Sequence, residues 1–186
     1  DYGIWFDGGW ITSEDNWDID ENGGSWDYDA ESKTLTLTNF RIEDPYLDAR
    51  GENQRKFFLI CENQNQPLTI RLIGDSSIGD PALPTDDCGI LVRGKLTIIG
   101  DPNCSFTVYA DDMAIMGPEL TINGGASVNC NTTGTALYLR KLEINDNSKL
   151  TVNARGNASY GLQIPGSSSG MNIAAGTLDV KAGTDR

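Results

Sequence analysis

A short apolar triplet, Leu-x-Ile, recurs along this chain and constrains its fold more than any other feature. Four copies have this form, and the variants Leu-x-Leu and Met-x-Ile lie outside them; the six triplets begin at Leu35, Leu68, Leu96, Leu120, Leu142 and Met171. Successive triplets begin 33, 28, 24, 22 and 29 residues apart. Short stretches of alternating apolar and polar residues precede and follow them, so one repeat contains three short strands.

A repeat of this length can form one coil of a solenoid. Coils stacked about 4.8 Å apart in parallel satisfy the backbone groups of the coils above and below. We therefore predict an all-β fold, a right-handed parallel β-helix of about five to six three-stranded rungs with an aromatic N-terminal hairpin cap. Residues 1–40 form the cap and hairpin leading into the first coil, and residues 41–186 form the rungs of the same domain. A β-sandwich is the alternative, although it does not require the same triplet at the same phase.

The two-residue period of a strand sorts the side chains into inward and outward sets. Equivalent inward residues should stack on one another from coil to coil. The expected inward ladders are Leu68/Leu96/Leu120/Leu142, Ile70/Ile98/Ile122/Ile144, Val108/Val128/Val152/Val180 and Ile90/Ile115/Leu137/Leu162. The expected outward ladder on the triplet strand is polar and contains Thr36, Thr69, Thr97, Thr121, Glu143 and Asn172.

Charge and composition exclude several classes of function. The chain has 14 Lys and Arg against 27 Asp and Glu, a net charge of −13, and no histidine. Such a protein repels nucleic-acid phosphates and anionic membrane surfaces. Without histidine there is no Ser-His-Asp or Cys-His catalysis and no zinc site with imidazole ligands. No stretch approaches the roughly 20 apolar residues of a membrane-spanning helix, so we expect neither a nucleic-acid partner nor membrane insertion.

Four cysteines are widely spaced, and none belongs to a Cys-x-x-Cys motif: Cys61, Cys88, Cys104 and Cys130. They allow two disulfides or none, and the sequence assigns no pairing. A chain of 186 residues can fold around its own core, which favours free, buried thiols.

A second outward line is apolar rather than polar. Ile60, Leu91, Met116, Tyr138 and Gln163 share one outward phase on successive coils. Such a stripe is either covered by a packed segment or serves as a contact surface. We favour coverage by the insertions at 42–56 and 79–87. Otherwise the stripe is a candidate groove for a ligand or protein, flanked by Arg93 and Arg140.

All four tryptophans, Trp5, Trp10, Trp17 and Trp26, fall in the first 26 residues. Residues 25–38 have the pattern of a hairpin with its turn at 29–33. The aromatic side chains can close the open end of the helix, where the core and a sheet edge would otherwise be exposed. Alternatively, exposed Trp5, Trp10 and Trp17 can form a platform on which sugar rings stack.

Acidic residues are expected to meet at one corner of neighbouring coils. Aligning Ile90 with Ile115 places Asp86 and Asp87 beside Asp111 and Asp112. Four carboxylates close together favour a hard cation, and calcium is the candidate cofactor. A glycosidase pair of acid and base is a second interpretation, and ordinary turn chemistry of Asp is the third.

Several phrases of the sequence resemble those of a known family. The phrases Tyr2-Gly3-Ile4-Trp5-Phe6-Asp7-Gly8, Trp26-Asp27-Tyr28-Asp29 and Leu68-Thr69-Ile70-Arg71-Leu72 are similar to those of secreted β-helical repeat modules of anaerobic, often gut, Gram-positive bacteria. The resemblance covers essentially the whole chain. It implies a cell-surface or secreted protein distantly similar to pectate-lyase-like and carbohydrate-binding β-helices. It implies no catalytic residue, and the histidine motif of β-helical polygalacturonases is missing.

These observations lead to one expected function and two alternatives. We expect an extracellular, non-catalytic module that binds a polysaccharide or a surface glycan, either as a monomer or as part of a longer multi-domain chain. The alternatives are a polysaccharide lyase or glycoside hydrolase that uses acidic turn residues, and a purely structural stalk.

Overall fold

The computed structural model describes residues 1–20, 23–43, 46–47, 56–64, 66–80, 87–156, 160–166 and 169–183. Within these residues the protein is all-β and contains no helix. Its strands form three sheets, which we name A, B and C. The described part of the chain accordingly has no helix that is long and apolar enough to cross a membrane.

The three sheets differ little in size. Sheet A contains, in spatial order, β2 (Gly9–Trp10), β1 (Ile4–Phe6), β8 (Lys56–Cys61), β11 (Asp87–Val92), β14 (Met113–Met116), β17 (Thr135–Tyr138) and β20 (Leu162–Gln163), and β7 (Tyr46–Leu47) pairs with β8 beside them. Sheet B contains β21 (Gly170–Ile173), β18 (Lys141–Ile144), β15 (Glu119–Asn123), β12 (Lys95–Gly100), β9 (Leu68–Ile73), β5 (Thr34–Thr38), β4 (Ser25–Asp29) and β3 (Trp17–Ile19). Sheet C contains β22 (Thr177–Ala182), β19 (Lys149–Ala154), β16 (Ser127–Thr132), β13 (Ser105–Ala110), β10 (Asp75–Ile78) and β6 (Arg41–Ile42).

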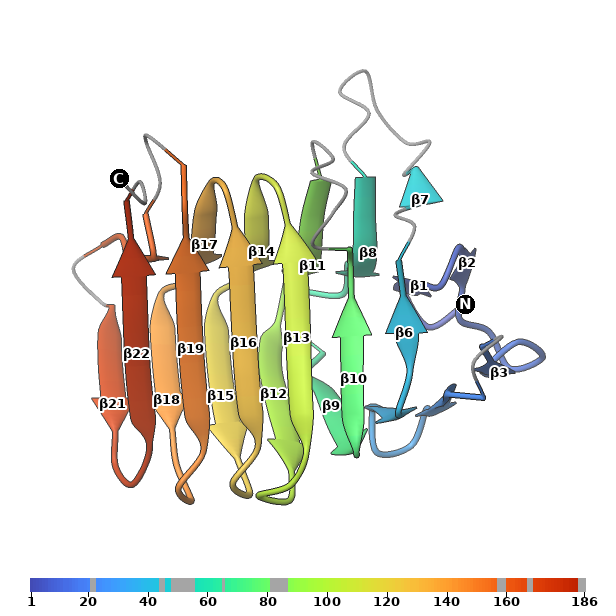
Figure 1. The fold of residues 1–186 in the computed structure, drawn as a ribbon. Helices are drawn as coiled ribbons and strands as arrows, with labels where there is room; N and C mark the ends of the chain where they lie inside the picture. The colour runs from blue at the N-terminus through green and yellow to red at the C-terminus, as the bar shows by residue number, and fades with distance from the viewer. Residues whose placement is uncertain are drawn as a thin grey trace.

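Most strand pairs are parallel, and they follow a regular order. From β8 to β22, consecutive strands enter sheets A, B and C in turn, and each pairs in parallel with the strand three places later in the same sheet. Figure 1 shows the resulting rows of strands. Antiparallel pairs involve β1, β2, β3, β4 and β7 near the N-terminus.

The core consists of stacked aliphatic side chains, as the repeat predicts. Leu96 pairs with Leu68 on one side and with Leu120 on the other, and Leu120 pairs with Leu142. The isoleucine ladder beginning at Ile70 and the ladder beginning at Ile90 have the predicted register too. These side chains are almost completely buried up to Leu142.

Two predicted ladders are wrong by two residues. Val128 pairs with Phe106 and Leu150, and Cys130 takes the predicted place of Val128 between Val108 and Val152. On the triplet strand, Thr34 rather than Thr36 pairs with Thr69. A shift of two residues leaves every side chain on the same face, so the alternation on which the prediction rests cannot detect it.

The predicted hairpin is confirmed and covers one end of the core. Strands β4 and β5 pair antiparallel, and Lys33 adopts φ 57° in the turn between them. Trp26 and Tyr28 of β4 are buried and belong to the main core. Strand β5 then pairs in parallel with β9, which joins the hairpin to the parallel strands of sheet B.

All four cysteines are buried and none forms a disulfide, as the chain length favoured. Burial raises the pKa of the Cys130 thiol to about 12. At neutral pH this group is therefore a thiol and a small core side chain rather than a nucleophilic thiolate.

Candidate functional site

The outer face of sheet A carries a largely apolar row that crosses the strands. Its members share one register position on neighbouring strands, which confirms the register predicted for the stripe. The antiparallel strands β1 and β2 add two tryptophans to the predicted residues. We call this set the outer row: Trp10, Trp5, Ile60, Leu91, Met116, Tyr138 and Gln163.

The alternation on β11 explains why the row faces outward. Ile90 and Val92 point into the core, and both are buried. Leu91, between them, is half-buried and packs against a separate apolar cluster that includes Trp5 and Ile60. The outer row therefore lies on the side of sheet A that faces away from the main core.

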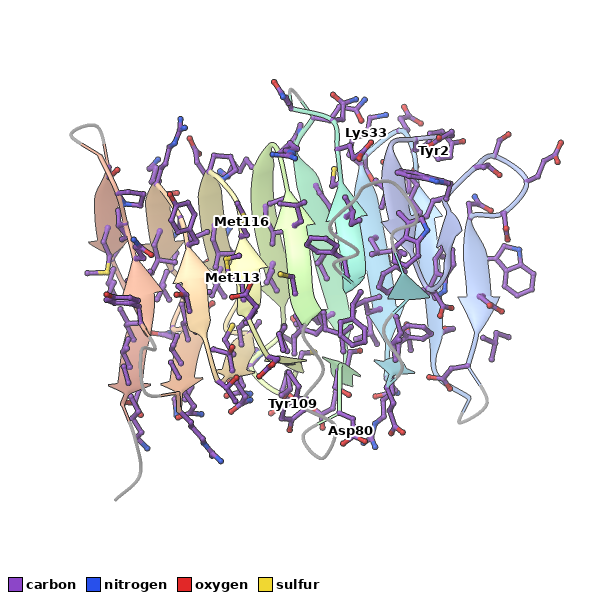
Figure 2. The ribbon with its side chains drawn as sticks, turned by 90° about the horizontal axis from the view of Figure 1, so that it is seen from above. Tyr2, Lys33, Asp80, Tyr109, Met113 and Met116 are labelled. Atoms are coloured by element: carbon purple, nitrogen blue, oxygen red, sulfur yellow. The ribbon has the colours of Figure 1, made fainter. Side chains whose placement is uncertain are left out.

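A second row runs beside the outer row on the same face. The register places Phe57, Cys88, Met113 and Thr135 in it. The Ala136 N–H donates to the Tyr160 carbonyl oxygen at 2.9 Å, which places Tyr160 beside Thr135. Tyr160 is 61% exposed, and the strand pattern does not predict its position because Tyr160 lies before the start of β20. Met113 and Met116, both labelled in Figure 2, show the two rows side by side on β14.

Exposure along the outer row increases from β1 to β20, whereas Trp10 on β2 is half-buried. Trp5 and Ile60 are buried, Leu91, Met116 and Tyr138 are half-buried, and Gln163 is exposed. The predicted covering segments, 42–56 and 79–87, lie largely outside the described residues, so coverage stays a prediction. The part of the row open to solvent extends from Leu91 to Gln163.

Two arginines border this open part. Arg93 and Arg140 are exposed, and each lies two residues beyond an outer-row residue, Leu91 and Tyr138. The N–H of Arg93 donates to the Cys61 carbonyl oxygen, and that of Arg140 to the Pro118 carbonyl oxygen, both at 2.9 Å. These bonds hold both residues at the ends of β11 and β17, which are two strands apart in sheet A. A strand spacing of about 4.8 Å places their backbones about 10 Å apart.

The predicted acidic corner is only partly described. Asp86 lies outside the described residues, and Asp87 begins β11, but its side chain is not described. Asp111 and Asp112 are half-buried just before β14. Thr133 donates to a carboxylate oxygen of Asp111, and Cys88 Sγ lies 3.9 Å from Asp112 Oδ2. In the part of the chain that is described, no group of three or more carboxylate, thiol or imidazole side chains is arranged to hold a metal ion; the calcium site stays a prediction.

The tryptophans separate into different environments. Trp5 and Trp10 belong to the outer row, whereas Trp26 is buried with its ring edge against Phe6, at a centroid distance of 5.5 Å. Trp17 is 60% exposed on β3 in sheet B. The platform predicted from Trp5, Trp10 and Trp17 is therefore not one surface: the first two pair across β1 and β2, and Trp17 lies in another sheet.

Asp7 provides a test of the packing of the cap. Its Oδ2 accepts a hydrogen bond from Trp26 Nε1 at 3.0 Å. Burial raises the pKa of Asp7 above its ordinary value of 3.8; the bond from Trp26 opposes this, and Asp18 and Asp20 add to it. The folded protein thus holds the proton more tightly than the unfolded chain, and stability falls as pH rises through the interval from 3.8 to the raised pKa.

Replacing Asp7 with asparagine is expected to raise the melting temperature at about pH 7 and to leave it almost unchanged at about pH 3. Asparagine keeps an acceptor for Trp26 and tolerates the φ of 50°. Asp29 is the matched control, because hydrogen bonds from Ser32 and Glu31 lower its pKa. Asp29→Asn should lower the melting temperature at neutral pH, and equal shifts in the two variants would contradict this account. Thermal unfolding followed by circular dichroism measures both.

Two cavities lie on the other sheets, and no pattern in the sequence predicts them. One, of about 460 Å³ on sheet C, is lined by Arg41, Asp80 and Tyr109 among others. The second, of about 620 Å³ on sheet B, is lined by Arg71, Ile73 and Ile99 among others. Neither contains a residue of the outer row.

The outer face of sheet A thus offers ring faces, thioethers and aliphatic groups between a basic border and an acidic one. This chemistry suits a ligand that stacks its apolar faces on the rows and forms hydrogen bonds at the borders. No family model, curated protein or solved structure matches this chain in comparisons with known proteins.

Proposed function

We propose that the protein is an extracellular, non-catalytic glycan-binding module whose coils form a right-handed parallel β-helix. The order in which consecutive strands enter the three sheets supports a helix of three-stranded rungs. In Figure 1 the strands of sheet C rise at the front as the chain advances toward β22, with the other strands returning behind them, a sense that favours right-handed winding. The resemblance to secreted β-helical modules supports the location on a cell surface.

The outer row is the observation that carries this proposal. It crosses seven strands of sheet A from Trp10 to Gln163. At about 4.8 Å per strand the whole row extends over about 29 Å, and its open part from Leu91 to Gln163 extends over about 14 Å, enough for a short chain of sugar rings. Tyr138 supplies a half-buried ring in the open part. Arg93 and Arg140 supply charged donors for hydroxyl or carboxylate groups of the ligand.

Replacing Tyr138 with alanine should weaken glycan binding about two- to tenfold, because an aromatic contact contributes about 0.5–1.5 kcal/mol. Binding is measured by affinity electrophoresis in gels that contain pectin, xylan or β-glucan, and then by calorimetry with the polysaccharide that retards the protein. Each measurement is repeated with calcium and with a chelator, so that the predicted ion at Asp111 and Asp112 is tested at the same time.

The control is Tyr109→Ala, which removes the same ring from the outward side of sheet C. It should bind like the unchanged protein. Retardation by none of the polysaccharides, with or without calcium, would contradict glycan binding and favour the structural stalk. Equal losses of glycan affinity in the two variants would show that the glycan does not bind to the outer face of sheet A.

A further inference from the structure

The cavity of about 620 Å³ on sheet B lies over two paired strands, β9 and β12. Arg71 and Ile73 alternate with buried residues on β9 and therefore point outward, as Ile99 does on β12. Ile73 and Ile99 are 46% and 38% exposed. All three side chains line the cavity, and its volume lies within the range of about 300–1,000 Å³ that is typical of small-molecule sites.

One wall of the cavity is a turn that is longer than the turn beside it. A single residue separates β9 from β10, whereas the four residues 101–104 separate β12 from β13. Cys104 donates its N–H to the Asp101 carbonyl oxygen at 2.9 Å, which closes the turn. Pro102 fixes φ at the second position. The turn therefore holds Asp101 and Asn103 in place, and both line the cavity.

Opposite charges lie at diagonal corners of this surface. The register places Arg71 opposite Ile99, and Asp101, two residues beyond Ile99, follows opposite Ile73. The two isoleucines therefore occupy the other diagonal. With strands about 4.8 Å apart and a rise of about 6.6 Å for two residues, the Cα atoms of Arg71 and Asp101 are about 8 Å apart. Among the described residues, neither of these charged side chains has an ion-pair or hydrogen-bond partner.

We infer that this cavity binds a short apolar peptide with free termini, about two residues long. The carboxylate of the peptide accepts hydrogen bonds from the Arg71 guanidinium, and its ammonium group binds the Asp101 carboxylate. An extended dipeptide is about 7 Å long, which matches the separation of about 8 Å between the two charged residues. The apolar side chains of the peptide then cover Ile73 and Ile99 and remove their exposed surface from water.

The net charge of the protein favours a ligand that carries both charges. At −13 the protein repels simple anions, so a carboxylate without an ammonium group binds less well beside Arg71. A cation without a carboxylate is repelled by Arg71 itself. A dipeptide has no net charge and pairs with both groups. Thr34 and Thr69 face each other beside Arg71 and line the cavity, so their hydroxyl groups supply further donors for the carboxylate.

Titration of the 186-residue chain with leucyl-leucine, followed by NMR, tests the proposal. We expect a Kd of about 1 mM, with shifts of the amide signals of β9, β12 and the 101–104 turn. Acetylation of the peptide removes its ammonium group, and amidation removes its carboxylate. Each change should weaken binding about two- to fivefold, as for exposed ion pairs. Glycyl-glycine, which lacks the apolar side chains, should bind about fivefold more weakly or less well still.

Combined changes in protein and peptide assign each charge. Asp101→Asn should weaken the binding of leucyl-leucine as much as acetylation does, and should not weaken the binding of the acetylated peptide further, because the same ion pair is already absent. Arg71→Gln should have the same relation to the amidated peptide. Lys95→Gln, on the outward side of β12 but outside the cavity, is the control and should leave every affinity unchanged. All three residues are exposed, and circular dichroism checks that the variants fold.

Several outcomes would overturn the proposal. Independent, additive losses from acetylation and from Asp101→Asn would show that the ammonium group does not bind this carboxylate. Binding of glycyl-glycine as tight as that of leucyl-leucine would exclude the apolar contact. Isocaproate has a carboxylate and an apolar body but no ammonium group, and binding as tight as that of the dipeptide would exclude recognition of both charges. The absence of any shift on β9 and β12 would exclude the cavity as the site.

Discussion

Replacing Leu120 with alanine is expected to destabilise the protein by about 2–5 kcal/mol. Leu120 is completely buried and lies between Leu96 and Leu142 in the leucine ladder. The neighbouring strands β12 and β18 are held at a fixed spacing by the backbone hydrogen bonds of sheet B, so the structure can close little of the cavity. The loss therefore includes both the burial energy of the side chain and the cost of the void. Urea unfolding followed by circular dichroism measures the change.

The matched control is Ile99→Ala, an aliphatic truncation on the outward side of β12 in the same sheet. Ile99 is 38% exposed, and its removal should cost less than about 1 kcal/mol. If truncation of Ile99 lowered the free energy of unfolding as much as truncation of Leu120, burial in the core would not be what determines the loss of stability.

Replacing Gly89 with alanine is expected to destabilise the protein by about 1–3 kcal/mol. A Cβ at this position would lie 2.5 Å from the Ala114 carbonyl oxygen and 2.5 Å from Val108 Cγ1. Ala114 belongs to the paired strand β14, so the clash involves backbone that is already bonded within sheet A. Both β14 and the Val108 side chain must therefore shift to make room for the added methyl group.

Gly170→Ala is the control for this substitution. Gly170 begins strand β21, and no heavy atom lies within 4 Å of its added Cβ. Alanine there should leave stability unchanged or raise it by about 0.4–1 kcal/mol through the unfolded chain. Urea unfolding compares the two variants, and a loss at Gly170 as large as that at Gly89 would exclude the close contact as the cause.

The candidate site was partly predictable from the sequence. The stripe from Ile60 to Gln163 follows from alternation and from the repeat, and its register is confirmed. The addition of Trp5 was not predictable, because β1 pairs antiparallel with β8, to which Ile60 belongs. No local pattern near Trp5 specifies a partner that far along the chain. Trp17 has the same residue type, yet it lies in another sheet.

The sequence by itself determined the layered β-structure and the face on which the side chains of the Leu-x-Ile strands lie, because a strand has a period of two and the triplets recur at one phase. It could not determine the register of Val128 or Leu35, since a shift of two residues preserves the pattern of faces. Tertiary structure alone decided which inward residues are buried. Leu142 and Met171 occupy the same ladder, but Leu142 lies between two layers and is buried, whereas Met171 has a layer on one side and is 52% exposed.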